Sequence, residues 1–227
     1  MFKMKLKYLV LVLLFGSILS VGLILISLTT NSWILSYPLN KHSNESSGEL
    51  RFGLFYGSGI INIGYGSRPR NYSVYNDIIA NDTNVFNYSL WILTTTSIGL
   101  TLICDSLSTI FTLLKTASKS SHKWTRVLIF INILSLISNI LSFASWLLQF
   151  NFYLKNNILI SKDQNDGWYS NGLSILGYGF YIVAFAILVT STNLLILNCI
   201  RFKEHFRTTD QEGSTYEEKT NGDIMLY

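Results

Sequence analysis

The sequence predicts an all-α membrane protein: a four-helix transmembrane bundle with a small β-containing first extracellular loop. Two observations predict this class. Of the 227 residues, 49% are hydrophobic and 13% are charged, a composition that favours a membrane protein over a soluble globule. Four stretches are also apolar over the roughly 20 residues that a helix needs to cross the hydrocarbon core. They cover residues 8–29, 90–114, 127–149 and 173–199.

The first apolar stretch follows a basic segment, residues 1–7, which contains Lys3, Lys5 and Lys7. A basic segment of this kind also begins a cleaved signal peptide. The apolar run here is about 20 residues long, whereas a signal core has about 7–15, and no clear small-x-small cleavage site ends it. We therefore expect an uncleaved first transmembrane helix over 8–29.

The positions of Lys and Arg predict the side of the membrane for each loop, because basic residues stay on the cytosolic side. Apart from the N-terminus, they gather in the loop 115–126 and at the start of the tail 200–227: Lys115, Lys119, Lys123, Arg126, Arg201, Lys203 and Arg207. Both termini are therefore expected in the cytosol, and the loops 30–89 and 150–172 outside. We expect a multi-pass protein of the plasma membrane that passes through the ER and Golgi. These basic ends and anionic lipid account for the net charge of +4, so no nucleic-acid partner is expected.

All four Asn-x-Ser/Thr sequons of the chain lie in the loop 30–89, at Asn44, Asn71, Asn81 and Asn87. Such sites are modified on the lumenal side of the secretory pathway, so their confinement to one loop agrees with the topology. Asn44, Asn71 and Asn81 are the N-glycosylation candidates. Asn87 lies too close to the start of the second span at residue 90.

The loop 30–89 is aromatic and patterned, and we expect it to fold. Residues 33–35 and 50–56 are typical of short strands. Glycines are expected to mark the turns between strands: Gly57, Gly59, Gly64 and Gly66. Phe55 and Tyr56 are expected to pack over the membrane-facing base of the loop rather than to bind a ligand.

The second and third spans each carry a stripe of small and polar residues on one helical face, because these residues recur at spacings of three and four. The stripes consist of Thr94, Ser97, Thr101, Asp105, Ser108 and Thr112, and of Asn132, Ser135, Asn139, Ser142 and Ser145. Such faces let helices approach closely and hydrogen bond where water is absent.

Asp105 is the costliest of these residues, at about 2.5–3.5 kcal/mol near a helix centre, so its carboxyl should face the bundle. Its depth matches residues 135–139 and 190–193, and we expect a hydrogen bond to one of those groups, such as Ser135 or Asn139, with the carboxyl ionised or protonated. Two roles stay open: an ion or proton pathway, and a packing contact that fixes helix register. The packing contact is favoured, because transporters usually show internal repeats, broken helices or several intramembrane charges.

The first loop contains a tryptophan, a Gly-Leu-aromatic run and an arginine in that order: Trp33, Gly53-Leu54-Phe55 and Arg68. In this pattern the chain resembles the claudin-like tetraspans. The run GELRFGLFYGSGIINIGYGSRPR, residues 48–70, is similar to the first-loop signature of the clarins, and the ending 223–227 resembles the clarin C-terminus. The motif residues are Trp33, Gly53, Leu54, Phe55, Gly57, Gly64, Gly66, Arg68 and Pro69. The resemblance implies a claudin-like fold. Arg68 and Arg70 contact either a partner or carbonyls of their own loop, and the resemblance favours a structural role for Arg68.

The first loop departs from this family pattern in its cysteines. Cys104 lies in the second span and Cys199 at the cytosolic end of the fourth, while Ile63 stands where the clarin pattern has Cys-Gly. A claudin-type disulfide therefore cannot form, and aromatic packing and sheet hydrogen bonds must hold the loop. Cys199 lies beside basic residues, where juxtamembrane cysteines are reversibly palmitoylated. An unmodified cysteine is the alternative.

The resemblance implies a non-enzymatic, clarin-like membrane organiser or scaffold that links membrane complexes to cortical actin or its adaptors in sensory or polarised cells. Two alternatives stay open: a claudin-like junction protein that forms a paracellular barrier, and an auxiliary subunit of an ion channel. Expected partners are membrane lipid, a channel or adhesion complex, and a second copy of the chain. Neither an enzyme nor a cofactor or metal is expected, because His42, His122 and His205 are scattered and no catalytic motif accompanies them.

The last three residues, Met225, Leu226 and Tyr227, present a carboxylate with apolar side chains at the final and third-from-last positions. Such an end can add as a strand to a PDZ domain, and a tail end without a partner is the alternative. The tail of about 25 residues is too short for a domain, so a link to actin is expected to pass through an adaptor.

Overall fold

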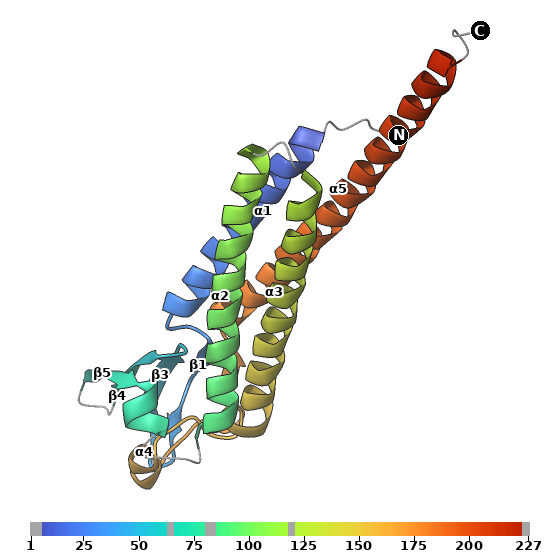
Figure 1. Ribbon diagram of the computed structural model, residues 1–227. Helices are drawn as coiled ribbons and strands as arrows, with labels where there is room; N and C mark the ends of the chain where they lie inside the picture. Colours follow the sequence, from blue (N-terminus) through green and yellow to red (C-terminus); the bar gives the residue numbers. More distant parts are fainter. Residues whose placement is uncertain (1–5, 63–65, 80–84, 118–120, 224–227) are drawn as a thin grey trace.

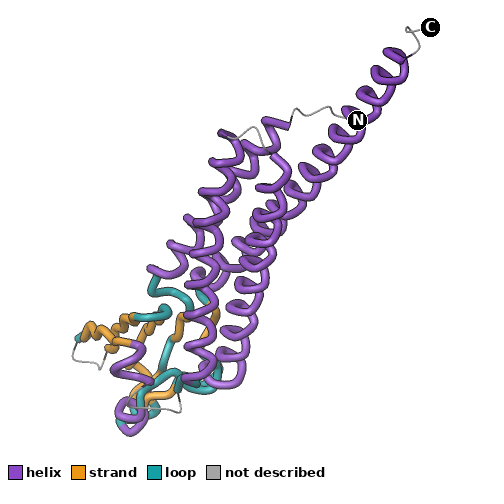
Figure 2. Tube along the Cα trace, in the orientation of Figure 1, coloured by secondary structure: helices purple, strands orange, loops and turns teal. Residues whose placement is uncertain are grey.

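The computed structural model describes residues 6–62, 66–79, 85–117 and 121–223. For residues 43–45, 68, 121–122 and 205–223 it describes the backbone alone. Long helices lie side by side, and a small antiparallel sheet sits at one end of them (Figures 1 and 2).

Four helices build the bundle: α1 (Leu6–Thr29), α2 (Tyr88–Ala117), α3 (Ser121–Gln149) and α5 (Tyr178–Asp223). Each contains a segment long and apolar enough to cross a membrane, as a multi-pass membrane protein requires. The first three cover the predicted spans and extend beyond them by up to about two turns. We call the end of the bundle that carries the sheet the sheet end, and the opposite end, where α1 begins and α5 ends, the tail end (Figure 1).

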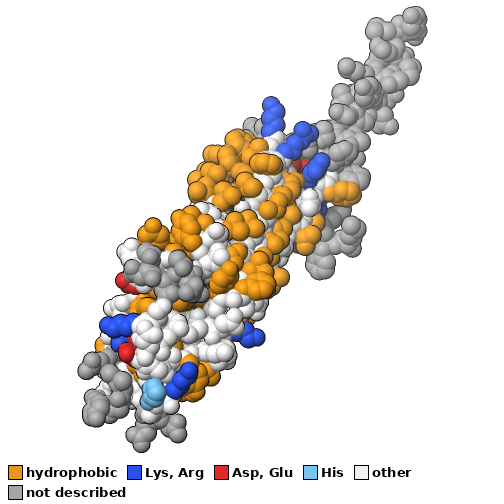
Figure 3. All heavy atoms as spheres, turned by 90° about the horizontal axis from the view of Figure 1, so that it is seen from below, with side chains coloured by type: hydrophobic (Ala, Val, Ile, Leu, Met, Phe, Trp, Pro, Cys, Tyr) orange, Lys and Arg blue, Asp and Glu red, His pale blue; other side chains and the backbone are white. Residues whose placement is uncertain are grey.

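The bundle carries polar residues inside and apolar residues outside. Thr94, Thr101 and Asp105 of α2 are buried, whereas Ile103 and Ile110 of the same helix are exposed. Hydrophobic side chains gather along the helices, with Lys and Arg side chains toward the ends (Figure 3). A bundle in lipid has this arrangement, because hydrocarbon solvates apolar side chains while polar groups must find partners inside the protein.

The predicted start of the fourth span at residue 173 is wrong. Ser174–Leu176 forms strand β7, which pairs with β1 (Ile34–Ser36), and α5 begins only at Tyr178. Three strand residues are too few to show an alternating pattern when an apolar helix follows directly. At its other end α5 continues to Asp223. Most of the predicted tail 200–227 is therefore a helical extension of the fourth span.

The sheet joins both long connections at the sheet end. Its strands lie in the order β5-β4-β3-β1-β7, and β2 pairs with both β3 and β6 beside this path. The remaining bounds are β2 (Leu39–Asn40), β3 (Ser43–Phe52), β4 (Tyr56–Asn62), β5 (Ser67–Ser73) and β6 (Trp168–Tyr169). Since β6 and β7 come from the α3–α5 connection and the rest from the α1–α2 connection, backbone hydrogen bonds hold the two connections together.

Three short helical segments complete the sheet end: η1 (Val74–Ile79), η2 (Phe150–Leu154) and α4 (Ser161–Asn165). η1 follows β5 directly, and the backbone N–H of Ser73 donates to Asp77 Oδ2 at 2.6 Å. η2 continues α3 without a break in the chain. α4 lies at the far edge of the sheet end (Figure 1).

The prediction that Gly57 and Gly59 mark turns is wrong. Both lie within β4 on the buried side of the sheet, where a Cβ at either position would lie 2.3 Å from a side-chain atom of Phe52 or Leu50. The glycines make room for these two large side chains. The chain bends instead at residues 53–55, between β3 and β4, so the predicted strand 50–56 is two strands.

Candidate functional site

Trp33 is the point at which the sheet is fastened to the bundle. The residue is 0% exposed, and its indole Nε1 donates to the carbonyl oxygen of Ser27 at 2.8 Å. Its ring meets that of Trp146 edge-on, with 4.9 Å between the ring centroids, and its backbone N–H donates to the carbonyl oxygen of Phe52 at 2.8 Å. Trp33 therefore contacts α1, α3 and β3 at once.

The motif residues 53–55 have separate places around this junction. A Cβ on Gly53 would lie 2.3 Å from the carbonyl oxygen of Thr30, so only glycine fits there. Leu54 is buried, and its carbonyl oxygen accepts from Trp91 Nε1 at 2.8 Å. Phe55 and Tyr56 are 41% and 65% exposed. Both side chains are thus less enclosed than the neighbouring Leu54, and their packing over the membrane-facing base of the loop stays a prediction.

The later motif residues lie around β5. Gly66 precedes it with a φ of +122°, a conformation that favours glycine. Arg68 and Pro69 pair with Ile61 and Ile60 of β4, whereas Gly64 and the side chain of Arg68 lie outside the described part of the chain.

Arg70 ties the two connections together through its side chain. Its Nη1 lies 2.6 Å from Asp163 Oδ1 on α4, and the Asp163 side chain is 5% exposed. The hydrogen bond to Asp163 raises the pKa of the Arg70 guanidinium above its usual value. Next to Arg70, burial raises the pKa of the Tyr72 hydroxyl. Of the two partners considered for Arg70, a group of its own chain is the one observed, although it is a carboxylate and not a carbonyl.

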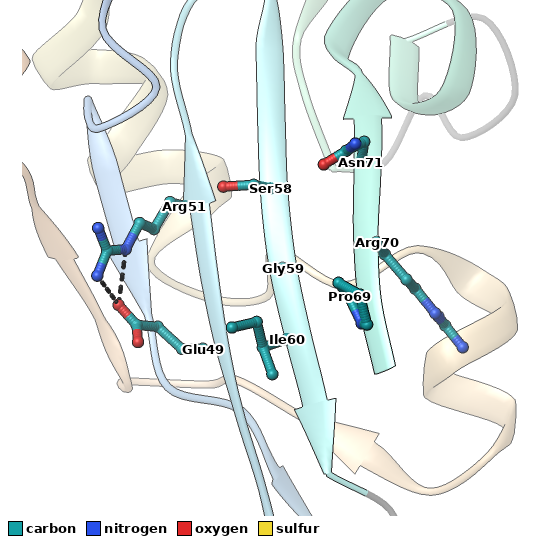
Figure 4. A pocket seen from close by; sticks show the side chains of 8 residues that line it. All are labelled: Glu49, Arg51, Ser58, Gly59, Ile60, Pro69, Arg70 and Asn71. Atoms are coloured by element: carbon teal, nitrogen blue, oxygen red, sulfur yellow. Dashed lines mark hydrogen bonds and ion pairs between the residues drawn. The ribbon is translucent and has the colours of Figure 1, made fainter. Parts of the chain in front are cut away.

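One face of the sheet is exposed and carries side chains of β3, β4 and β5. Two shallow hollows of about 400 and 410 Å³ lie on it and meet at Glu49 and Ile60. Figure 4 shows the first, lined by side chains of β3, β4 and β5. Glu49 and Arg51 form an ion pair at 2.7 Å along β3, while Ile60 beside them is 51% exposed. An exposed pair of this kind contributes little stability, so these side chains remain available for contacts.

The asparagines of the candidate glycosylation sites differ in exposure and in hydrogen bonding. Asn71 is exposed on β5 opposite Ser58 (Figure 4). Asn87 begins α2: its Oδ1 accepts from the backbone N–H of Leu90 at 3.2 Å, and its Nδ2 donates to the hydroxyl of Tyr153 at 2.9 Å. The side chain of Asn44, and Asn81 as a whole, lie outside the described residues. Asn71 is thus the described sequon with a free surface.

Inside the bundle, Asp105 is the centre of a polar layer that all four helices share. Asp105 is 2% exposed. Its Oδ1 lies 2.5 Å from Ser135 Oγ on α3 and its Oδ2 lies 2.5 Å from Ser20 Oγ on α1. Ser20 in turn lies 3.3 Å from Thr190 Oγ1 on α5. The carboxyl faces the bundle, and Ser135 was among the partners that its depth predicted. The α1 partner, Ser20, was not predicted, because its contact with Asp105 joins positions 85 residues apart.

A second polar layer lies one turn nearer the tail end. Asn132 Nδ2 donates to Ser108 Oγ at 2.8 Å, and Ser17 Oγ lies 3.5 Å from Ser108 Oγ. Asn139, the other residue named beside Asp105, does not join either layer. It is fully buried, and neither of its amide atoms has a hydrogen-bond partner among the described residues.

A buried ion pair closes the tail end. Lys115 Nζ on α2 lies 2.9 Å from Glu204 Oε1 on α5, and their side chains are 2% and 7% exposed. Thr125 on α3 donates to Glu204 Oε2 at 2.8 Å and accepts from Lys115. The sequence interpretation used Lys115 only as a topology signal. Because Glu204 lies 89 positions away, no local pattern links the two.

The two cysteines and the three C-terminal residues remain to be placed. Cys104 is buried in α2 and Cys199 is exposed on α5, and both are free thiols. Met225, Leu226 and Tyr227 lie outside the described residues, so the proposed PDZ ligand stays a prediction.

Among the residues that the structure describes, no group of three or more His, Cys, Asp or Glu side chains is placed to hold a metal ion. Comparisons with protein-family models and with curated proteins find no match for this sequence. The resemblance to the clarins therefore depends on the sequence motif alone and stays a prediction.

Proposed function

We propose that this chain is a non-enzymatic, four-span organiser of membrane complexes of the clarin-like type. In this proposal it lies in the plasma membrane with both termini in the cytosol and the sheet outside. The basic residues at the tail end and the sequons at the sheet end support this orientation. The arrangement of one small antiparallel sheet at the end of four candidate spans is compatible with it.

The observation that carries the proposal is the way the sheet is fixed. Strand β1 pairs with β7, which leads directly into α5, and the Arg70–Asp163 ion pair joins β5 to α4 in the same connection. The buried Trp33 packs the sheet against the bundle. A surface held in this way can present fixed contacts to another protein at a small cost in ordering. The face around Ile60, with its apolar centre and flanking ion pair, has the composition of a small protein interface.

The partner of this face is, in our proposal, the outer part of another membrane protein, while the C-terminal residues recruit cytosolic adaptors. The face lies at the sheet end, and α5 runs from there to the tail end, so in this proposal one chain joins a membrane complex to the cortical cytoskeleton. Cys199, exposed near the tail end, would strengthen membrane anchoring there if it is palmitoylated.

Proximity labelling and mild-detergent copurification from native cells test the proposal. Three variants are compared with the intact chain: Ile60→Lys, Asn156→Lys, and a chain that lacks residues 225–227. Asn156 is exposed on the α3–α5 connection, so its variant adds the same charge away from the candidate face. We expect Ile60→Lys to lose membrane-protein partners, the truncation to lose scaffold and actin-linked partners, and Asn156→Lys to lose neither.

The other outcomes distinguish the alternative functions. One channel recovered equally by all variants, with its gating altered, would favour an auxiliary subunit. Contacts between chains of adjacent cells, together with a change in transepithelial resistance, would favour a barrier protein. A full set of partners retained by both Ile60→Lys and the truncation would contradict the organiser proposal.

A further inference from the structure

The hydrogen-bond chain at Asp105 can be checked by counting protons. Four contacts form it: Ser135 Oγ with Asp105 Oδ1, Ser20 Oγ with Asp105 Oδ2, Ser20 Oγ with Thr190 Oγ1, and Thr190 Oγ1 with the carbonyl oxygen of Ala186 at 2.9 Å. Each hydrogen bond needs one proton between its two oxygen atoms. The three hydroxyl groups supply three protons. An ionised carboxylate supplies none, so one of the four contacts would be left without a proton.

The direction of each bond locates the missing proton. The carbonyl oxygen of Ala186 can only accept, so the hydroxyl of Thr190 donates to it. In its contact with Ser20, Thr190 can then only accept, and Ser20 has a single proton to donate. With an ionised carboxylate, Ser20 donates to Asp105 Oδ2 and the 3.3 Å contact with Thr190 lacks a proton. When Ser20 donates to Thr190 instead, the proton of the 2.5 Å contact comes from the carboxyl. With a neutral carboxylic acid, all four contacts carry a proton.

The neighbouring polar layer provides an internal comparison. There Asn132 donates to Ser108, Ser108 donates to Ser17, and Ser17 donates to the carbonyl oxygen of Leu13 at 3.0 Å. Three neutral groups supply three protons for three bonds. The Asp105 chain runs in the same sense, from one polar side chain through hydroxyls to a helix carbonyl, and balances in the same way only when Asp105 is neutral.

Within the described part of the chain, the groups that contact Asp105 are neutral. The contacts that α1, α3 and α5 make to it come from Ser20, Ser135 and, through Ser20, Thr190. None of the ion pairs between described residues includes Asp105. Lys115, on the same helix, lies about 15 Å away along the axis and pairs with Glu204. An unpaired charge at this depth is strongly disfavoured against the neutral acid.

We propose that Asp105 is a proton-binding site: at neutral pH the carboxyl keeps its proton and donates it to Ser20, and the chain Asp105–Ser20–Thr190–Ala186 runs in one direction across α2, α1 and α5. Ser135 of α3 donates to the other carboxyl oxygen. The bound proton thus links all four helices. Its role is to fix the register of the bundle without a buried charge, and this goes beyond the organiser function.

Infrared spectroscopy of the full chain in lipid vesicles tests the inference. A protonated carboxylic acid has a carbonyl stretch that is well separated from the bands of an ionised carboxylate and that shifts in D₂O. At neutral pH we expect one such band, lost in Asp105→Asn and kept in Asp163→Asn, whose carboxylate pairs with Arg70. An asparagine can accept from Ser135 and donate to Ser20, so Asp105→Asn should keep the fold.

A second variant covers the case in which Asp105→Asn does not fold. Ser20→Ala leaves the carboxyl in place and removes the acceptor of its proton, so the carboxylic acid band should shift to higher frequency. The inference is overturned if the wild-type spectrum contains no protonated-acid band at neutral pH, or if the band is unaffected by both the Asp105 and the Ser20 substitutions.

Discussion

At the scale of single residues, substitutions of the buried residues Gly53 and Asn139 are expected to change stability in opposite directions. Gly53 is required because the backbone of Thr30 occupies the place of a side chain. Asn139 fills its space, yet its amide has no partner among the described residues. A buried amide without a partner costs about 1–3 kcal/mol. The two positions therefore predict effects of opposite sign.

The first prediction compares two Gly→Ala substitutions. Gly53→Ala places a Cβ 2.3 Å from the carbonyl oxygen of Thr30, and the forced backbone shift should cost about 1–3 kcal/mol. Gly22→Ala, in α1, has nothing within 4 Å of the added atom and should be neutral or stabilising by up to about 1 kcal/mol. Thermal unfolding in detergent, followed by size-exclusion fluorescence, measures both. Equal melting temperatures would show that the sheet and bundle separate easily at this junction.

The second prediction compares two asparagines on α3. Asn139→Leu removes an amide without a described partner and should stabilise the bundle by about 1–3 kcal/mol. Asn132→Leu removes the donor to Ser108 and to the carbonyl oxygen of Leu128 and should destabilise it by about 1–2 kcal/mol. The same thermal assay applies. Loss of stability in Asn139→Leu would mean that an ordered water joins Asn139 to its neighbours.

At the scale of elements, α5 has two roles in one helix. Its first turn follows β7, so the sheet is connected directly to the fourth span. At the tail end, Glu204 fastens the same helix to α2 and α3 through Lys115 and Thr125. Helix α5 thereby connects the sheet to the tail end, where the Lys115–Glu204 ion pair holds it to α2.

The third prediction concerns this ion pair. Lys115→Met removes the ammonium from a buried carboxylate and should cost about 3–5 kcal/mol. In the double variant Lys115→Met/Glu204→Leu the buried charge is also removed, so most of that loss should be recovered. Thermal unfolding of both variants and of Glu204→Leu alone gives the coupling energy. Additive losses in the double variant would show that the two side chains act independently.

At the scale of the whole molecule, the sequence predicts the spans well and the sheet only in part. The spans are predictable because each is an apolar run of about 20 residues, which is longer than the apolar runs of buried helices or signal peptides. The prediction of Asp105 facing the bundle followed from the cost of its charge in lipid. The glycines of β4 were wrongly predicted to mark turns. Glycine is needed there because large side chains of β3 pack against these positions. The strand β7 and the partners Ser20 and Glu204 depend on contacts far apart in the chain, which one sequence does not reveal.

The last prediction tests the orientation of the whole molecule through its glycans. If the sheet end is lumenal, Asn71→Gln should remove one glycan, seen as a shift to lower apparent mass that disappears after enzymatic deglycosylation. Asn87→Gln should leave the glycan number unchanged, because Asn87 is bonded to Leu90 and Tyr153, but it should lower the yield of folded protein. The two substitutions are chemically identical, so each controls for the other. An intact chain without a glycan on any sequon would contradict the proposed orientation. A glycan lost in Asn87→Gln would show that Asn87 is accessible in the cell, so that the second span begins after the hydrogen bond between Asn87 and Leu90.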